Sequence, residues 1–281
     1  MCRWSRRNLS GFFNRRPCYG GRNGTTSDNI PETPIDGSIN NAEHIIEVVI
    51  AGNNSVSDID FGFSFNVVTN IDDADEDDSS ARWYQGSLRQ FINNANQIDG
   101  DNIMRFVPAI ATNQTGANGT WWDLDTDNSS MPTLTDGGTT IDGTAYDFTD
   151  PDQVRDTHTG TVGGDAGTIT TVGTDAVSFN LFERKELQIN TAETPLFIVN
   201  SSEGNIVVRE IAFYNGNEAG VIQLQNNPDG IIEDNFIGPF ADGTTPSGND
   251  RIRSGVFFND SDNSFSVDIL NNYIWFWVDL T

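Results

Sequence analysis

Apolar and polar residues alternate along residues 57–70, which is typical of a half-buried β-strand. In this stretch, SDIDFGFSFNVVTN, the apolar positions are Ile59, Phe61, Phe63, Phe65 and Val67. The preceding apolar run HIIEVVIAG, residues 44–52, predicts another strand, and a Gly-Asn-Asn turn signal separates the two. The pattern therefore predicts two adjacent strands.

The period of the pattern changes at residue 87. Ser87 is a good N-cap residue, and the apolar positions after it recur at the spacing of one helix face: Leu88, Phe91, Ile92 and Ala95. Gly100 and Asp101 end this pattern, and an apolar strand follows from Ile103. We therefore expect one short amphipathic helix, which would cover the open end of a stack of strands.

The C-terminal third contains a loose internal repeat. Three segments align: GNIVVREIAFYNG (204–216), DGIIEDNFIGPF (229–240) and NSFSVDILNNYIWF (263–276). The alignment makes Ile211, Asn235 and Asn272 equivalent, 24 and 37 residues apart, and likewise Phe213, Ile237 and Ile274. About 24 residues suffice for three short strands and their turns, and an inserted loop, ADGTTPSGNDRI, explains the longer interval. Stacked asparagines would pass amide hydrogen bonds between repeats.

These segments together resemble the entry region of right-handed parallel β-helices, of the pectin-lyase-like kind, in large bacterial secreted and cell-surface proteins. The resemblance is carried by VVTN, GSLRQFINNAN, IMRFVP and MPTLTDGGTTIDGT, and it covers roughly residues 60–281. It implies an all-β solenoid, a right-handed parallel β-helix with a short N-terminal capping helix. A β-sandwich and a propeller fragment are the alternative folds.

A second resemblance concerns the N-terminal side. DIDFGF is similar to the last strand of the small collagen-adhesin B-type β-sandwich modules of bacterial surface proteins. The predicted organisation is a disordered leader and linker (1–42), terminal strands of such a module or lead-in strands (43–70), and the β-helix (71–281). A loop-rich insertion is expected at about 145–180. We expect the natural protein to continue beyond Thr281.

The charge of the chain and the positions of its cysteines restrict the classes of partner and the cellular location that we expect. The net charge is −26, and residues 1–23 carry six arginines and no acid, so all 41 acidic residues lie in the rest of the chain. Such an acidic body repels nucleic acid and anionic lipid, and no apolar run is long enough to insert into a membrane. Both cysteines lie in the basic leader. A cysteine-free body fits an extracellular or cell-surface location.

The search for catalytic motifs gives no complete set. The hydrolases of the fold that this chain resembles carry N-x-D, D-D, G-H-G and R-x-K on consecutive coils. This chain lacks G-H-G and has Arg251-Ile252-Arg253 where R-x-K would stand. The lyases of that fold use calcium and a basic residue, for which Arg209, Arg251 and Arg253 are candidates. Surface ion pairs with the abundant Asp and Glu are the alternative role of these arginines. The sequence places no carboxylate cluster beside them, so we predict no catalytic residue.

Two stretches are candidate binding sites. Asp123, Asp125 and Asp127 have the D-x-D-x-D spacing that opens a calcium loop, although the later positions of an EF-hand are absent. They are candidate Ca²⁺ ligands, and a solvated loop is the alternative. Trp121 and Trp122 are candidates for stacking on a sugar, and packing in a core is the alternative.

The sequence therefore predicts a non-catalytic structural or adhesive segment of an exported bacterial cell-surface protein. Its expected partners are extracellular glycans or the surface of a host or neighbouring cell, contacted through loops. The alternative is a fragment of a polysaccharide lyase or glycoside hydrolase of the pectin-lyase-like fold.

Overall fold

The fold is known from a computed structural model. It describes residues 66–71, 86–126, 131–150, 152–163, 169–172, 175–178, 180–191, 195–200, 205–216, 220–226, 229–259 and 266–275. In these residues the structure is mostly β-strands with one α-helix, which confirms the all-β class. The predicted strand over 44–52, most of that over 57–70, and the acidic run 72–80 lie outside the described residues.

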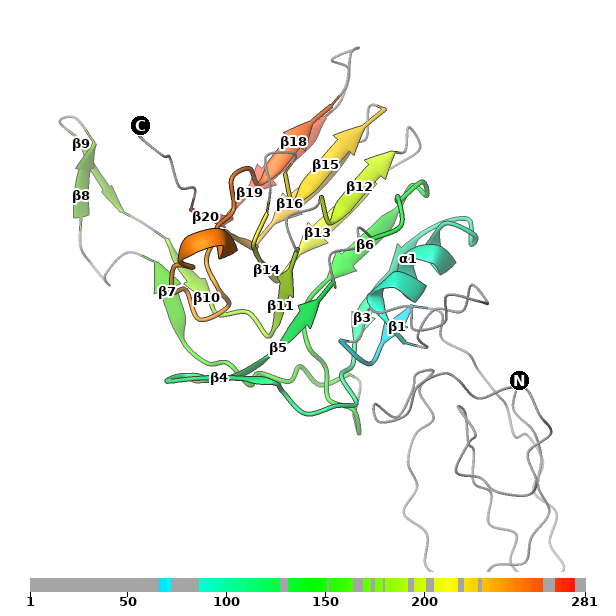
Figure 1. The fold of residues 1–281 in the computed structure, drawn as a ribbon, viewed down its shortest axis with the longest axis horizontal. Helices are drawn as coiled ribbons and strands as arrows, with labels where there is room; N and C mark the ends of the chain where they lie inside the picture. The colour runs from blue at the N-terminus through cyan, green and yellow to red at the C-terminus, as the bar shows by residue number, and fades with distance from the viewer. Residues whose placement is uncertain are drawn as a thin grey trace, which may run out of the picture.

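Three sheets of mainly parallel strands form the body of the fold (Figure 1). The six-stranded sheet has the order β20 (Tyr273–Ile274), β17 (Phe236–Ile237), β14 (Ile211–Tyr214), β11 (Leu187–Asn190), β5 (Gly119–Asp125) and β4 (Gln114–Gly116). The five-stranded sheet has the order β19 (Val267–Leu270), β16 (Asp229–Glu233), β13 (Asn205–Arg209), β6 (Thr139–Asp142) and β2 (Asn102–Ile103). The three-stranded sheet consists of β12 (Phe197–Asn200), β15 (Ile222–Gln225) and β18 (Val256–Phe258). Only β4 is antiparallel to its neighbour in these sheets.

The chain visits the three sheets in a fixed order. β13, β14 and β15 lie in the five-, six- and three-stranded sheets, and β16, β17 and β18 repeat that order. Phe213 pairs with Ile237, and Ile237 pairs with Ile274, which confirms the repeat alignment predicted from the sequence. The inserted loop ADGTTPSGNDRI, which explains the longer interval between the second and third repeat segments, lies between β17 and β18. It includes a short 3-10 helix, η2 (Gly248–Asp250).

The chain between β6 and β11 leaves the three sheets. Here β7 (Thr161–Gly163) pairs antiparallel with β10 (Leu181–Glu183), and β8 (Ile169–Val172) pairs antiparallel with β9 (Asp175–Ser178). The expected insertion at 145–180 falls within this stretch. In Figure 1 these strands lie on the side of β11 and β14 away from α1.

The helix α1 (Leu88–Ala95) begins at the predicted cap. Ser87 Oγ accepts a hydrogen bond from the backbone N–H of Gln90 at 3.1 Å. The predicted apolar face is buried and joins the main core cluster, which also contains Met104, Phe106 and Ile141. Figure 1 shows α1 beside β3 (Arg105–Phe106) and β1 (Val67–Val68), which pair in parallel.

Two apolar clusters stabilise the fold. The larger one includes Trp122, Leu187, Ile211 and Phe213, whose strands alternate inward and outward residues. The smaller one lies on the other face of the six-stranded sheet and contains Trp121, Ala212, Phe236 and Ala241, with Val162, Phe182 and Tyr273 against it. The long stretch after β6 therefore covers this outer face.

Candidate functional site

The two tryptophans that were candidates for sugar stacking both lie in the interior. Trp122 is fully buried, its Nε1 donates a hydrogen bond to the Ile110 carbonyl at 3.2 Å, and the Arg155 guanidinium lies 4.8 Å from its ring centre. Trp121 points to the opposite face of β5 and stacks on the His158 ring at 4.5 Å. Only 6% of Trp121 is exposed. In this structure neither ring presents a face to a sugar.

Two of the three aspartates that were candidate Ca²⁺ ligands lie on β5. Asp123 and Asp125 are described, whereas Asp127 lies outside the described residues. Asp123 Oδ2 accepts hydrogen bonds from the Tyr214 hydroxyl at 3.1 Å and from Gln114 Nε2 at 3.2 Å. Burial raises the pKa of Asp123 to about 6. In the part of the chain that the structure describes, no three His, Cys, Asp or Glu side chains are grouped for a metal ion.

A row of charges crosses the outer face of the five-stranded sheet. Register places Asp142 of β6, Arg209 of β13 and Glu233 of β16 side by side. Arg209 donates from Nε and Nη2 to Asp142 Oδ2 at 2.9 Å, and its Nη1 lies 3.7 Å from Glu233 Oε1. Arg209 thus forms the ion pairs that were the alternative to a catalytic role. The sequence placed no carboxylate cluster beside it, because its partners come from neighbouring strands that are remote in sequence.

A second ion pair lies next to this charged row. Lys185, the single lysine of the chain, is 3% exposed at its side chain, and its Nζ lies 2.6 Å from Glu210 Oε2. The Lys185 Nζ also lies 5.4 Å from the centre of the Phe236 ring. Burial raises the pKa of Glu210, and the Lys185 ammonium opposes that shift. A buried ion pair of this kind needs both members, because either one alone would be an uncompensated charge.

Glu186 is the most perturbed carboxyl in this region. Burial raises the pKa of Glu186 to about 8, and the nearby negative charges of Asp156 and Glu210 act in the same direction. At neutral pH Glu186 therefore carries a proton. A protonated carboxyl is one component of general acid–base chemistry, although structural ion-pair networks perturb carboxyls as well.

The sequence contained only part of the signal for the charged row. Arg209 and Glu233 occupy the same place in two of the aligned repeat segments, so their adjacency follows from that alignment. Asp142 lies 67 residues before Arg209, on the far side of the long excursion, and no repeat or motif connects the two. The ion pair between Lys185 and Glu210 also depends on where the excursion returns to the sheet.

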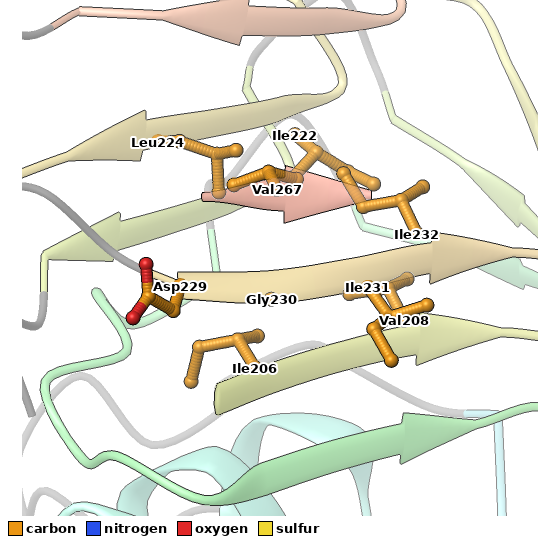
Figure 2. Close-up of a pocket in the computed structure, with 9 residues that line it drawn as sticks. All are labelled: Ile206, Val208, Ile222, Leu224, Asp229, Gly230, Ile231, Ile232 and Val267. Carbon is orange, nitrogen blue, oxygen red and sulfur yellow. The ribbon is translucent and has the colours of Figure 1, made fainter. Parts of the chain in front are cut away.

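The interior offers little room for a ligand in the region shown in Figure 2. A cavity of about 10 Å³ lies between β13, β15, β16 and β19. Its lining residues are Ile206, Val208, Ile222, Leu224, Asp229, Gly230, Ile231, Ile232 and Val267. This volume is at the lower limit for one water molecule. The cavity is therefore a packing void and no binding pocket.

Comparison of the chain with protein-family models, with curated proteins and with solved structures gave no match. Among the described residues, no helix has the length and apolar character that crossing a membrane requires. The interpretation of function therefore rests on the residues and their geometry.

Proposed function

We propose that the three parallel sheets are the walls of a right-handed parallel β-helix, and that the chain is a non-catalytic structural or adhesive segment of an exported bacterial cell-surface protein. The observation that carries the proposal is the strand register. Each sheet receives its strands in the order in which the chain makes them, from β11 through β14 and β17 to β20. Strands stacked in this way extend a rod by about 4.8 Å per coil.

Side-chain hydrogen bonds support a rigid stack at the corners, which are the turns where the chain passes from one sheet to the next. Asn235 Nδ2 donates to the Val208 carbonyl at 2.9 Å, and Asn272 Nδ2 donates to the Ile232 carbonyl at 2.7 Å. Asn272 Oδ1 also accepts from the Asn235 backbone N–H at 3.0 Å. Each amide therefore connects its own coil to the preceding one. A stalk that holds an adhesive surface away from a cell requires such stiffness.

The adhesive part of the proposal rests on the surface of the chain. An acidic, cysteine-free body is compatible with an extracellular location and with glycan or cell-surface partners. The partners would be contacted through the loops that leave the stack, because loops carry function on rigid scaffolds. We therefore propose an extracellular or cell-surface location for the chain.

The proposal is tested by measuring binding and turnover on the same preparation of the full chain. We expect binding to an array of bacterial and host glycans, or to intact cells, with no product from polygalacturonate, alginate or neutral polysaccharides. Release of reducing ends, or of unsaturated uronates by their ultraviolet absorbance, would overturn the non-catalytic proposal. Absence of binding to every glycan and cell type would leave the spacer role and remove the adhesive one.

A second candidate function is cleavage of a polysaccharide at the charged row. It is favoured by the partly exposed Arg209 side chain, by Glu233 beside it and by the raised pKa of Glu210 nearby. If turnover is found, Glu210→Gln and Arg209→Ala should reduce it by about 100-fold or more. The matched control is Glu183→Gln, because Glu183 is exposed on β10, away from the charged row. Equal activity of all three variants would exclude this site.

A further inference from the structure

The segment formed by residues 155–160, called here the cover segment, lies directly against β5. Its backbone contacts the strand on both sides of His158. The Thr120 N–H donates to the Thr157 carbonyl at 2.9 Å, and the Thr159 N–H donates to the Asn118 carbonyl at 3.1 Å. Gly119 allows this approach, because a Cβ on it would overlap the Thr157 carbonyl oxygen. The cover segment therefore depends on close backbone contact with one glycine.

His158 is the side chain that the cover segment inserts toward the sheet. It is 1% exposed, and its ring is nearly parallel to the Trp121 indole, at 15° and 4.5 Å. Its Nδ1 lies 3.1 Å from the Lys185 carbonyl oxygen. A carbonyl only accepts hydrogen bonds, so Nδ1 carries the proton and Nε2 of the neutral ring has a free lone pair. Nε2 is buried and has no hydrogen-bond partner among the described residues.

The charged groups around His158 come from three elements. Asp156 belongs to the cover segment, Arg184 belongs to the link between β10 and β11, and Asp242 belongs to the loop after β17. Arg184 Nη1 donates to the Thr161 carbonyl at 2.9 Å, which fixes a positive charge beside the segment. Burial lowers the pKa of His158, and Arg184 adds to this, while the hydrogen bond to the Lys185 backbone and the two aspartates oppose it. A second proton would lie on Nε2, in a site without an acceptor.

We propose that His158 is an acid-sensitive latch: addition of a proton to Nε2 releases the cover segment from β5 and exposes the indole face of Trp121. The proton comes from solvent, and the released ring is hydrated as an imidazolium. The device converts a buried aromatic surface into an exposed one. It acts on the outer face of the six-stranded sheet and does not depend on the proposed adhesive role.

The direction of the pH effect follows from the sign of the shift. The pKa of His158 is lower in the folded state than its ordinary value of 6.5, so the latch is fully closed above pH 6.5 and weakens as the pH falls below it. Asp123 and Glu186 have raised pKa values, of about 6 and about 8, so their contributions weaken as the pH rises. Opening toward acid therefore distinguishes His158 from these two carboxyls.

The test combines imidazole NMR with hydrogen exchange on the full chain. The chain has two histidines, His44 and His158, so a His44→Gln variant leaves one imidazole to titrate. We expect a pKa below 6.5 for His158. Below pH 6.5, amide protection of residues 155–160, corrected for intrinsic exchange, should fall by about tenfold per pH unit until His158 is protonated in the folded state. A pKa of 6.5 or above, or protection independent of pH, would overturn the proposal.

Two variants show whether opening of the cover segment in acid depends on His158 or on general acid destabilisation of the fold. His158→Phe retains an aromatic stack on Trp121 but has no proton to gain, so protection of the cover segment should become independent of pH. Gly119→Ala should open the segment at neutral pH by direct overlap with Thr157. Protection elsewhere in the chain, for example at β13, reports whether each variant is folded. Acid opening that persists in His158→Phe would refute the latch.

Discussion

Asn235 shows how one side chain satisfies several backbone groups at a corner. Its amide is fully buried, accepts from the Ile211 N–H at 3.2 Å and donates to the Val208 carbonyl at 2.9 Å. The Ile211 N–H lies at the start of β14, and the Val208 carbonyl lies within β13. The buried amide therefore joins the two strands that meet at this corner and satisfies its own polar atoms on them.

Replacing Asn235 by alanine should therefore destabilise the protein by about 2–4 kcal/mol, because the buried hydrogen bonds of its side chain to Ile211 and Val208 are lost. Urea unfolding followed by circular dichroism measures the change. The control is Asn226→Ala, since Asn226 is exposed and pairs with Asn200 at the surface, and it should cost less than about 1 kcal/mol. Equal losses in the two variants would contradict the structural role of Asn235.

The protonation of Glu186 gives a second prediction at this scale. Its pKa is raised to about 8, so its neutral form is the one that the folded state favours. Stability should decrease as the pH rises from the ordinary carboxyl pKa of 4.5 to about 8, because the unfolded state then releases the proton that the folded state keeps, and it should level off above about pH 8. Glu186→Gln should remove this decrease, whereas Glu183→Gln, an exposed control, should retain it. Thermal melting between about pH 5 and pH 9 tests both variants.

At the scale of elements, the helix and the late repeats could be predicted from the sequence. Ser87 and the spacing of four apolar residues locate α1 because the capping and packing of a short helix are local. The pairing of β14 with β17 and of β17 with β20 follows from an alignment of segments that lie close in the sequence. Both signals are contained in short windows of the chain.

The pairing of β5 with β11 and of β6 with β13 could not be predicted in this way. Trp122 pairs with Leu187, and Asp142 pairs with Arg209, across the whole excursion. For the same reason, the sequence did not locate the charged row. The sequence also left open whether Trp121 and Trp122 bind a sugar. Alternation along β5 places one ring on each face of the sheet, but it does not show that residues of the excursion cover the outer face.

Removing the cap of α1 should weaken the fold locally. Ser87→Ala deletes the acceptor for the Gln90 N–H and should lower the free energy of unfolding by about 1 kcal/mol. Ser87→Thr preserves a hydroxyl acceptor at this buried position and serves as the matched control, with a smaller loss than Ser87→Ala. Calorimetry of the two variants measures the difference. Equal losses of unfolding free energy in the two variants would mean that the start of the helix is stabilised by packing of Ser87 and not by its capping hydrogen bond.

At the scale of the whole molecule, the sheets give a graded pattern of stability. β18, β19 and β20 lie at the ends of their sheets and carry exposed apolar side chains such as Phe257, Ile269 and Ile274. β13 and β14 have a strand on both sides, and every residue of β14 is buried. In a stack where each unit contacts only its neighbours, opening begins at such ends.

Hydrogen exchange measured by mass spectrometry should therefore show the slowest amides in β11, β13 and β14 and the fastest of the strand amides in β19 and β20. Protection should decrease in steps from one strand to the next within each sheet. Uniform protection across all three sheets would indicate a single cooperative unit instead.

The corner between the five- and six-stranded sheets also has a meaning for protein engineering. Between β13 and β14 the chain turns this corner with one residue, Glu210, whereas between β6 and β11 it uses residues 143–186. The strands on either side nevertheless keep their register, since Asp142 pairs with Arg209 and Leu187 with Ile211. The length of the chain at this corner is thus uncoupled from the position of the strands. The corner is a site where a foreign peptide or a small domain could be grafted without shifting the scaffold.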